Sequence, residues 1–131
     1  PKYAQGEHAF GFGKGAGMIH PNMATMLAYI FTPARLSFEN LRKIHLEVTE
    51  RTFNSITVDG CTSTNDSFLL ISLGEEELPE EEVKRETYEV AQKIAKLIVA
   101  DGEGATKIGV VKIVNAESKE KAKAIAERVA T

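Results

Sequence analysis

The first candidate for chemistry is Thr25, a single hydroxyl between two methionines in the stretch GMIHPNMATMLAYIF, residues 17–31. Thr25 stands where an apolar run typical of a β-strand begins, and β-branched residues suit strands for structural reasons alone. A threonine hydroxyl is a poor nucleophile near neutral pH and needs a base beside it. The local pattern alone therefore favours an ordinary strand residue that forms a hydrogen bond.

The glycine-rich stretch GFGKGAG, residues 11–17, first suggests a phosphate site. A P-loop requires Ser or Thr after its lysine, but Lys14 is followed by glycine. A dinucleotide fingerprint placed on the same glycines fails as well, because His20-Pro21 follows where a helix should begin. The sequence therefore predicts no nucleotide site. It predicts a strand that runs into a loop, whose backbone passes close to another group and which carries Lys14.

No other local pattern marks a reactive site. The histidines His8, His20 and His45 lie too far apart for a metal-ligand spacing, so no metal site is predicted. Cys61 is the single cysteine, which excludes an internal disulfide, fits a reducing compartment and favours a small, half-buried residue. Around it, TVDGCTSTND (residues 57–66) has the composition of a turn whose side chains bond to the backbone.

Composition bounds the class of protein. The chain has 131 residues, 43% of them apolar, which is enough for one domain with a buried core. The charge is −3 and no basic stripe is present, so nucleic-acid binding is not expected. No apolar run is long enough for a membrane span, and no signal peptide is visible at the start of the sequence. We expect a cytoplasmic protein, and the ends of the sequence suggest a domain taken from something longer.

Hydrophobic periodicity and capping residues predict an alternation of strands and helices. Strands are expected at residues 8–18 (running into the loop), 23–32 (ended by Pro33), 56–58, 67–73 and 107–114, and helices at 38–53 (capped by Ser37), from Pro79 to about 100, and 118–129. The inward faces of the helices are predicted to be Leu41, Ile44 and Val48, then Val83, Thr87, Ala91, Ile94 and Ile98, then Ala122, Ile125, Ala126 and Val129. This order predicts an α/β or α+β layer fold, with β-sheet flanked by helices.

Three blocks of sequence, taken together and in order, carry a resemblance. They are KGAGMIHPNMATMLAYI, FNSITVDGCTSTNDS and VADGEGATK, and they closely resemble the ornithine acetyltransferase family, also called bifunctional glutamate N-acetyltransferase, of the cyclic arginine pathway. The resemblance spans essentially the whole chain. It implies the layered fold of that family, in which an N-terminal threonine produced by self-cleavage is the nucleophile.

The resemblance assigns chemistry to the MATML block. It implies self-cleavage between Ala24 and Thr25, after which the freed α-amino group of Thr25 is the base for its own hydroxyl. An α-amino pKa of about 7.7–8.0 leaves a usable neutral fraction near pH 7. The implied reaction moves an acetyl group from N-acetylornithine to glutamate through an acetyl-Thr25 ester. No dissociable cofactor is implied, although acetyl-coenzyme A is an alternative acetyl donor for some members.

Two further residues match substrate-binding positions of the family. Lys14 in KGAGM is implied to pair with an amino-acid carboxylate, and Glu103 in DGEGA to bind an ammonium group of the substrate. The block around Cys61 is implied to support the site through hydrogen bonds. Two departures from the family pattern, Cys61 after TVDG and Thr32-Pro33 after the nucleophile strand, leave Thr25 untouched.

The resemblance also implies that residues 1–24 end an α-chain and residues 25–131 begin a β-chain of a longer protein. A Thr-Gly oxyanion hole and further substrate-binding residues are implied to lie outside the sequence. Loss of one oxyanion donor costs about 10²–10³ in rate, so the 131-residue chain alone is expected to be a poor enzyme. The expected partners are those missing segments or another copy. Two alternatives stay open: a non-catalytic module, and a domain that binds an amino acid without turnover.

Overall fold

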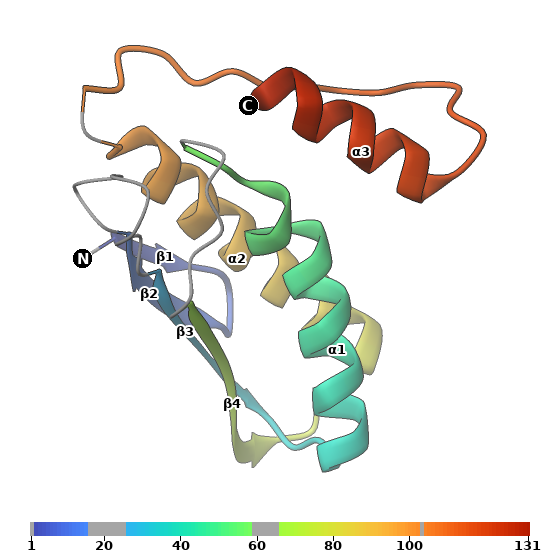
Figure 1. Cartoon of the computed structure of the whole chain (residues 1–131). Coiled ribbons are helices and arrows are strands. Elements are labelled where there is room, and N and C mark those ends of the chain that lie inside the picture. The colour runs from blue at the N-terminus through green and yellow to red at the C-terminus, as the bar shows by residue number, and fades with distance from the viewer. Residues whose placement is uncertain (1, 16–25, 59–65, 103) are drawn as a thin grey trace.

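The computed structural model describes residues 2–15, 26–58, 66–102 and 104–131. Its elements, in chain order, are β1 (Lys2–Gln5), β2 (Phe10–Lys14), β3 (Leu27–Ala34), α1 (Phe38–Arg51), the short 3₁₀ helix η1 (Phe53–Ser55), β4 (Ser67–Glu76), α2 (Glu80–Ala100) and α3 (Lys119–Ala130). Figure 1 shows α1 and α2 side by side against a single sheet. The predicted fold class, a sheet covered by helices, is therefore confirmed.

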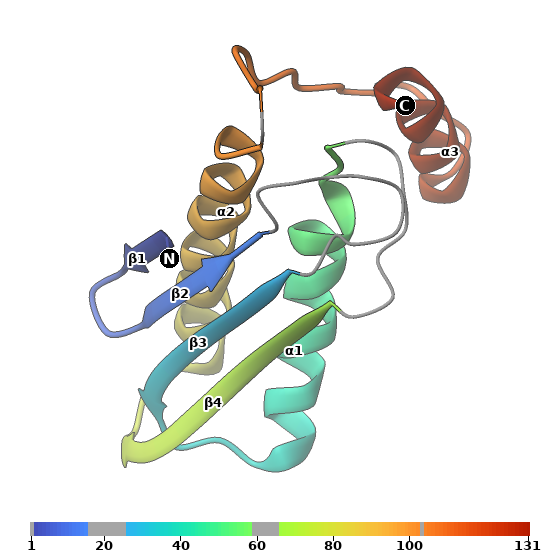
Figure 2. The same ribbon diagram turned by 60° about the vertical axis from the view of Figure 1, so that its left-hand side comes forward.

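The four strands form one mixed sheet in the order β1-β2-β3-β4. The β1–β2 and β2–β3 pairs are antiparallel, whereas β3 and β4 are parallel and are joined through α1. A parallel pair needs such a crossover, because a tight hairpin reverses the chain. Both α1 and α2 lie on one face of this sheet (Figure 2).

The core lies between that face and the two helices. In β3, burial alternates strictly, so Ala28, Ile30, Thr32 and Ala34 face the helices. The predicted inward face of α2 is confirmed, because all five of its residues are buried. Ile44 and Val48 are buried in α1 as predicted, and Ser37 caps that helix by accepting a hydrogen bond from the Asn40 N–H at 3.2 Å.

The glycines of β2 let α2 approach the sheet. An ideal Cβ placed on Gly11 would lie 2.8 Å from Ile94 Cδ1 and 2.9 Å from the Tyr29 carbonyl oxygen. One placed on Gly13 would lie 2.8 Å from Ile94 Cγ2. The predicted close approach at this stretch is therefore an approach of helix to strand, and it explains the glycines without a phosphate.

The strands of the structure differ from the predicted ones in two details. Residues 2–5 form β1, a strand that the sequence does not predict. Pro33 lies inside β3 instead of ending it. It comes after Phe31, the last residue of β3 that pairs with β2, and within a register irregularity toward β4, so its missing N–H breaks no regular ladder.

Two predicted strands are wrong within the described structure. Residues 56–58 follow η1 without pairing, and residues 107–114 are extended but pair with no described strand. Val110, in the second segment, is 86% exposed. An apolar β-prone run becomes a strand only where another strand can take its hydrogen bonds, and none of the described ones does.

The helix α3 forms where predicted, with Ser118 as its cap, but its predicted inward face is wrong. None of its residues is buried, and Ile125 and Val129 are exposed. Figures 1 and 2 both show α3 apart from the sheet. One contact that holds it is the hydrogen-bonded ion pair from Lys123 Nζ to Glu50 Oε1 at 2.9 Å. This pair lowers the pKa of Glu50 and raises the pKa of Lys123.

Among the described helices, none is long and apolar enough to cross a membrane.

Candidate functional site

The candidate site is the end of the sheet where β2 finishes and β3 and β4 begin. Lys14, the last residue of β2, is the register partner of Leu27, the first residue of β3. Leu27 is in turn the partner of Ser67, the first residue of β4. Figure 2 shows these three strand ends side by side. Pairing therefore places Lys14 beside the start of β3, two positions from Thr25 in the sequence.

The residue that follows Thr25 is fixed on both sides of its backbone. The Met26 N–H donates to Asp66 Oδ1 at 2.9 Å, and the Met26 carbonyl accepts from the Ser67 N–H at 2.9 Å. The Met26 side chain packs against the core. Asp66 ends the polar block around Cys61, and its bond joins that block to β3, 40 residues earlier in the chain; residues 59–65 of the block lie outside the described residues. The chain entering β3 is thus held in one position.

The end of α2 lies at the same edge. A Cβ on Gly15, the residue after Lys14, would lie 2.8 Å from Ile98 Cγ2 in the last turn of α2. Asp101, which follows α2, forms an ion pair of 3.1 Å with Lys2 at the start of β1. A Cβ on Gly102, the residue before Glu103, would lie 3.0 Å from Val58 Cγ1. The described residues next to all three sequence blocks therefore converge on this end of the sheet.

Of the predicted site residues, the structure describes some and not others. Lys14 is described, and its side chain is exposed. It shares with Phe12 the sheet face away from α2, since Gly11 and Gly13 face the helix. None of the ion pairs among the described residues involves Lys14, so its ammonium group is available to an anion. Ala24, Thr25, Cys61 and Glu103 lie outside the described residues, and their roles stay predictions.

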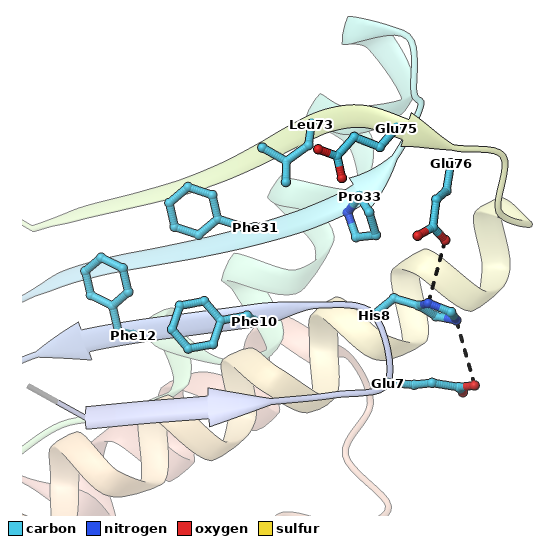
Figure 3. A pocket seen from close by; sticks show the side chains of 9 residues that line it. All are labelled: Glu7, His8, Phe10, Phe12, Phe31, Pro33, Leu73, Glu75 and Glu76. Atoms are coloured by element: carbon cyan, nitrogen blue, oxygen red, sulfur yellow. Dashed lines mark ion pairs between the residues drawn. The ribbon is translucent and has the colours of Figure 1, made fainter.

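A second feature lies at the other end of β2. An open hollow of about 620 Å³ is lined by Glu7, His8, Phe10, Phe12, Phe31, Pro33, Leu73, Glu75 and Glu76 (Figure 3). Its carboxylates and imidazole come from the β1–β2 turn and the end of β4. Sequence reading missed this grouping because His8 lies 68 positions before Glu76 and 74 before Glu82, distances that no local motif spans. They meet because the β1–β2 turn, the end of β4 and the first turn of α2 lie together in the fold.

Comparison with known proteins identifies the family. The sequence profile of the ArgJ family matches residues 3–131. The arginine biosynthesis bifunctional protein ArgJ of Aquifex aeolicus is 58% identical over 134 residues, covering 99% of this chain and 35% of that protein. Its namesake in Thermus thermophilus is 48% identical over 135 residues, with the same two shares. The chain thus spans about a third of the length of these curated relatives.

A solved structure supports the same relationship. The crystal structure of the arginine biosynthesis bifunctional protein ArgJ from Bacillus halodurans aligns with a TM-score of 0.56 and 34% sequence identity. The alignment covers 60% of this chain and 41% of that chain. The family profile, the curated relatives and the solved structure agree, and the chain belongs to the ArgJ family.

Proposed function

We propose that this chain carries the nucleophile of an acetyltransferase of arginine biosynthesis, which moves the acetyl group of N-acetylornithine to glutamate. The proposal depends on family membership and on one observation of the structure. Lys14 stands opposite Leu27, at the strand that begins two residues after Thr25, and Met26 is held there by Asp66. A substrate carboxylate bound by Lys14 would lie beside the proposed nucleophile.

The nucleophile is proposed to arise by hydrolysis of the Ala24–Thr25 peptide bond. One water is consumed, Ala24 gains a carboxylate, and Thr25 gains a free α-amino group. That amine is the base the threonine hydroxyl requires, and it belongs to the same residue. Before cleavage the nitrogen is an amide without basicity, so an intact chain is expected to be inactive.

Transfer then takes place in two balanced steps. The Thr25 hydroxyl attacks the acetyl carbonyl of N-acetylornithine, its proton passes through the α-amine to the departing nitrogen, and ornithine leaves behind an acetyl ester. The amine of glutamate attacks this ester, N-acetylglutamate forms, and the proton returns to the threonine oxygen. A covalent acetyl-enzyme predicts ping-pong kinetics. The scheme uses no dissociable cofactor, and acetyl-coenzyme A is the proposed alternative donor.

The two flanking residues are proposed to hold the substrate. Lys14 pairs with a carboxylate, in keeping with its exposed side chain and its freedom from ion pairs among the described residues. Glu103, one residue beyond Gly102, is proposed to bind an ammonium group of the amino acid. N-acetylornithine and glutamate each carry a carboxylate, so one lysine can orient both in turn.

Further chain segments are proposed to complete the enzyme. The exposed apolar side chains of α3 and residues 107–114 would pack against segments that the longer relatives possess, or against a second copy. Residues 1–24 and 25–131 would then be the end of an α-chain and the start of a β-chain. The single cysteine is in keeping with a cytoplasmic location.

The test starts with the intact mass of purified protein under denaturing conditions. Two species that divide between Ala24 and Thr25 are expected, whereas Thr25→Ala should leave one species of 14.3 kDa. Acetyl transfer is then measured with the chain in its full-length protein. Thr25→Ala should abolish transfer, and Thr131→Ala, at an exposed threonine after the last helix, should leave it unchanged. Transfer by an uncleaved chain would overturn the proposal, and ligand binding without transfer would favour an amino-acid-binding domain.

A further inference from the structure

We infer that a divalent transition-metal ion of the zinc class binds between the β1–β2 turn and the first turn of α2, held by Glu7, His8 and Glu82. His8 Nε2 lies 3.7 Å from Glu82 Oε1 and 3.9 Å from Glu7 Oε1. One ligand atom from each residue can be chosen so that all lie within 4.8 Å of one another. Figure 3 shows Glu7 and His8 at the rim of the hollow. This site is independent of the proposed acetyltransferase.

The distances suit an ion between the side chains better than direct hydrogen bonds. Contacts of 3.7 and 3.9 Å exceed the limit of about 3.2 Å for a normal N–H···O bond. Zinc bonds nitrogen and carboxylate oxygen at about 2.0–2.2 Å, so tetrahedral ligands lie about 3.4 Å apart. The two distances from His8 Nε2 are within about 0.5 Å of that spacing, and no pair of ligand atoms in the cluster needs to close by more than about 1.4 Å. A fourth position stays open for water, as in sites with three protein ligands.

Charge also favours a cation here. Three carboxylates, those of Glu7, Glu76 and Glu82, surround a single imidazole. In the described structure, the ion pairs that involve these three glutamates are all with His8 and none is with Lys or Arg. A protonated imidazole would leave two of the three negative charges uncompensated, whereas a divalent ion beside a neutral imidazole would leave only one.

The other ring nitrogen faces a carboxylate. His8 Nδ1 lies 3.8 Å from Glu76 Oε2, on the opposite side of the ring (Figure 3), so a normal hydrogen bond would need the two atoms to come about 0.6 Å closer. Metal-ligating histidines donate their second N–H to a carboxylate or carbonyl, which fixes the tautomer and the ring orientation. Glu76 is therefore placed as a positioning residue and not as a ligand. A nitrogen ligand among the carboxylates favours zinc-class ions over Mg²⁺ and Ca²⁺, which prefer oxygen alone.

The backbone that presents His8 is fixed by a buried carboxylate. Glu86 is 4% exposed, and its Oε1 accepts from the N–H groups of His8 and Ala9, the latter at 2.8 Å. A Cβ on Gly6 would lie 2.4 Å from that same oxygen, so the turn needs glycine there. Glu82 and Glu86 are four residues apart on one face of α2. One turn of α2 thus supplies both a proposed ligand, Glu82, and the carboxylate of Glu86 that holds the backbone of His8.

The test is calorimetric titration of the untagged 131-residue chain with ZnCl₂ and CoCl₂, in a Cys61→Ser background that removes the thiol. We expect one ion per chain, and visible absorption bands of four-coordinate Co²⁺. His8→Gln and Glu7→Gln should each weaken binding tenfold or more. Glu76→Gln should weaken it by about 10-fold, through ring orientation. Zinc at 100 times its Kd should raise the melting temperature by about 8 °C.

The matched control is Glu75→Gln. Glu75 lines the same hollow and carries the same charge, but forms no ion pair with His8. A change of less than threefold in the affinity of Glu75→Gln for the metal would show that direct ligation by Glu7, His8 and Glu82, and not nearby negative charge in general, causes binding. Equal losses in Glu75→Gln and Glu7→Gln would show only a diffuse attraction and overturn the proposal, as would no saturation below about 1 mM. Glu7 is a safe site for this comparison, because its side chain is 78% exposed and circular dichroism should show an unchanged fold.

Discussion

Replacing Gly11 by alanine tests whether close packing between β2 and α2 is the reason for the glycine-rich stretch. The added methyl group would lie 2.8 Å from Ile94 Cδ1, 2.9 Å from the Tyr29 carbonyl oxygen and 3.0 Å from Ile30 Cγ1. The first atom is the end of a side chain that can turn away. The second belongs to the paired strand β3, which cannot move without disturbing the sheet.

The magnitude follows from two opposing effects. Overpacking a well-filled core costs about 1–3 kcal/mol. Alanine in a strand recovers about 0.5–1 kcal/mol, because glycine loses more backbone freedom on folding. The net expectation is a loss of about 1.5 kcal/mol in the free energy of unfolding. With a urea m-value of about 2 kcal/mol/M, the midpoint falls by about 0.8 M at constant m.

A double-mutant cycle measures how much of the loss comes from Ile94 Cδ1 and how much from the strand β3. Ile94→Val deletes Cδ1, the atom that faces Gly11, and keeps the Cγ2 that faces Gly13. Ile94→Val alone should cost about 1 kcal/mol. It should couple favourably with Gly11→Ala by about 1 kcal/mol, so the double variant is little worse than Gly11→Ala. With Gly13→Ala its effect should simply add, since the clash with Cγ2 remains.

Two results would refute the reasoning. If Gly11→Ala is as stable as the parent, the glycine is not there for the helix. If Ile94→Val rescues Gly13→Ala as well as Gly11→Ala, the clash is not between the atoms named.

Three further changes test other parts of the structure. Thr87 is fully buried and its hydroxyl has no hydrogen-bond partner among the described residues, so Thr87→Val should raise the free energy of unfolding by about 1 kcal/mol in urea titrations. Gly74 has a φ of +70°, a conformation that is unfavourable for alanine. Gly74→Ala should therefore lower the free energy of unfolding by about 1 kcal/mol, although the added methyl group meets no atom. Lys123 lowers the pKa of Glu50 below 4.5, so the pair's stabilisation is present above that value and is lost as the pH falls through the lowered pKa. The same pair raises the pKa of Lys123 above 10.5. At high pH, the stabilisation by the pair is therefore lost only as the pH rises through this raised pKa. Because both side chains are more than a third exposed, about 0.5 kcal/mol or less is involved, and hydrogen exchange of α3 should show it in the parent and not in Glu50→Gln.

Local patterns were sufficient where an element carries its own signal. The cap at Ser37, the buried stripe of α2 and the apolar start of β3 were all readable, because each depends on residues within a few turns of one another. β1 was missed because KYAQ has no such signal, and it becomes a strand only by pairing with β2.

The two wrong strands and the exposed face of α3 have the opposite cause. Their sequences have a clear apolar pattern. Such a pattern shows which face of a segment could be buried, but not whether another element lies close enough to cover it or to pair with it. Val110 and Val129 remain 86% and 66% exposed because no described element covers them. Such faces are the ones that, in the function proposed above, would pack against segments that the longer relatives possess.

The glycine-rich stretch shows how the two kinds of information combine. Its glycine spacing suggests a phosphate-binding loop. In the structure, however, Gly11 and Gly13 are alternate residues of β2 and both face Ile94. Their absent side chains let α2 lie close to the strand, and alternation then places Lys14 on the opposite face, at the end of β2 beside Leu27. The glycines therefore affect the position of Lys14 through the packing of β2 against α2. If the proposed function holds, Gly13→Ala should weaken acetyl transfer by the full-length protein, measured per folded molecule, because it displaces Lys14. A normal rate per folded molecule would contradict this prediction. It would show that the position of Lys14 does not depend on how closely α2 packs against β2.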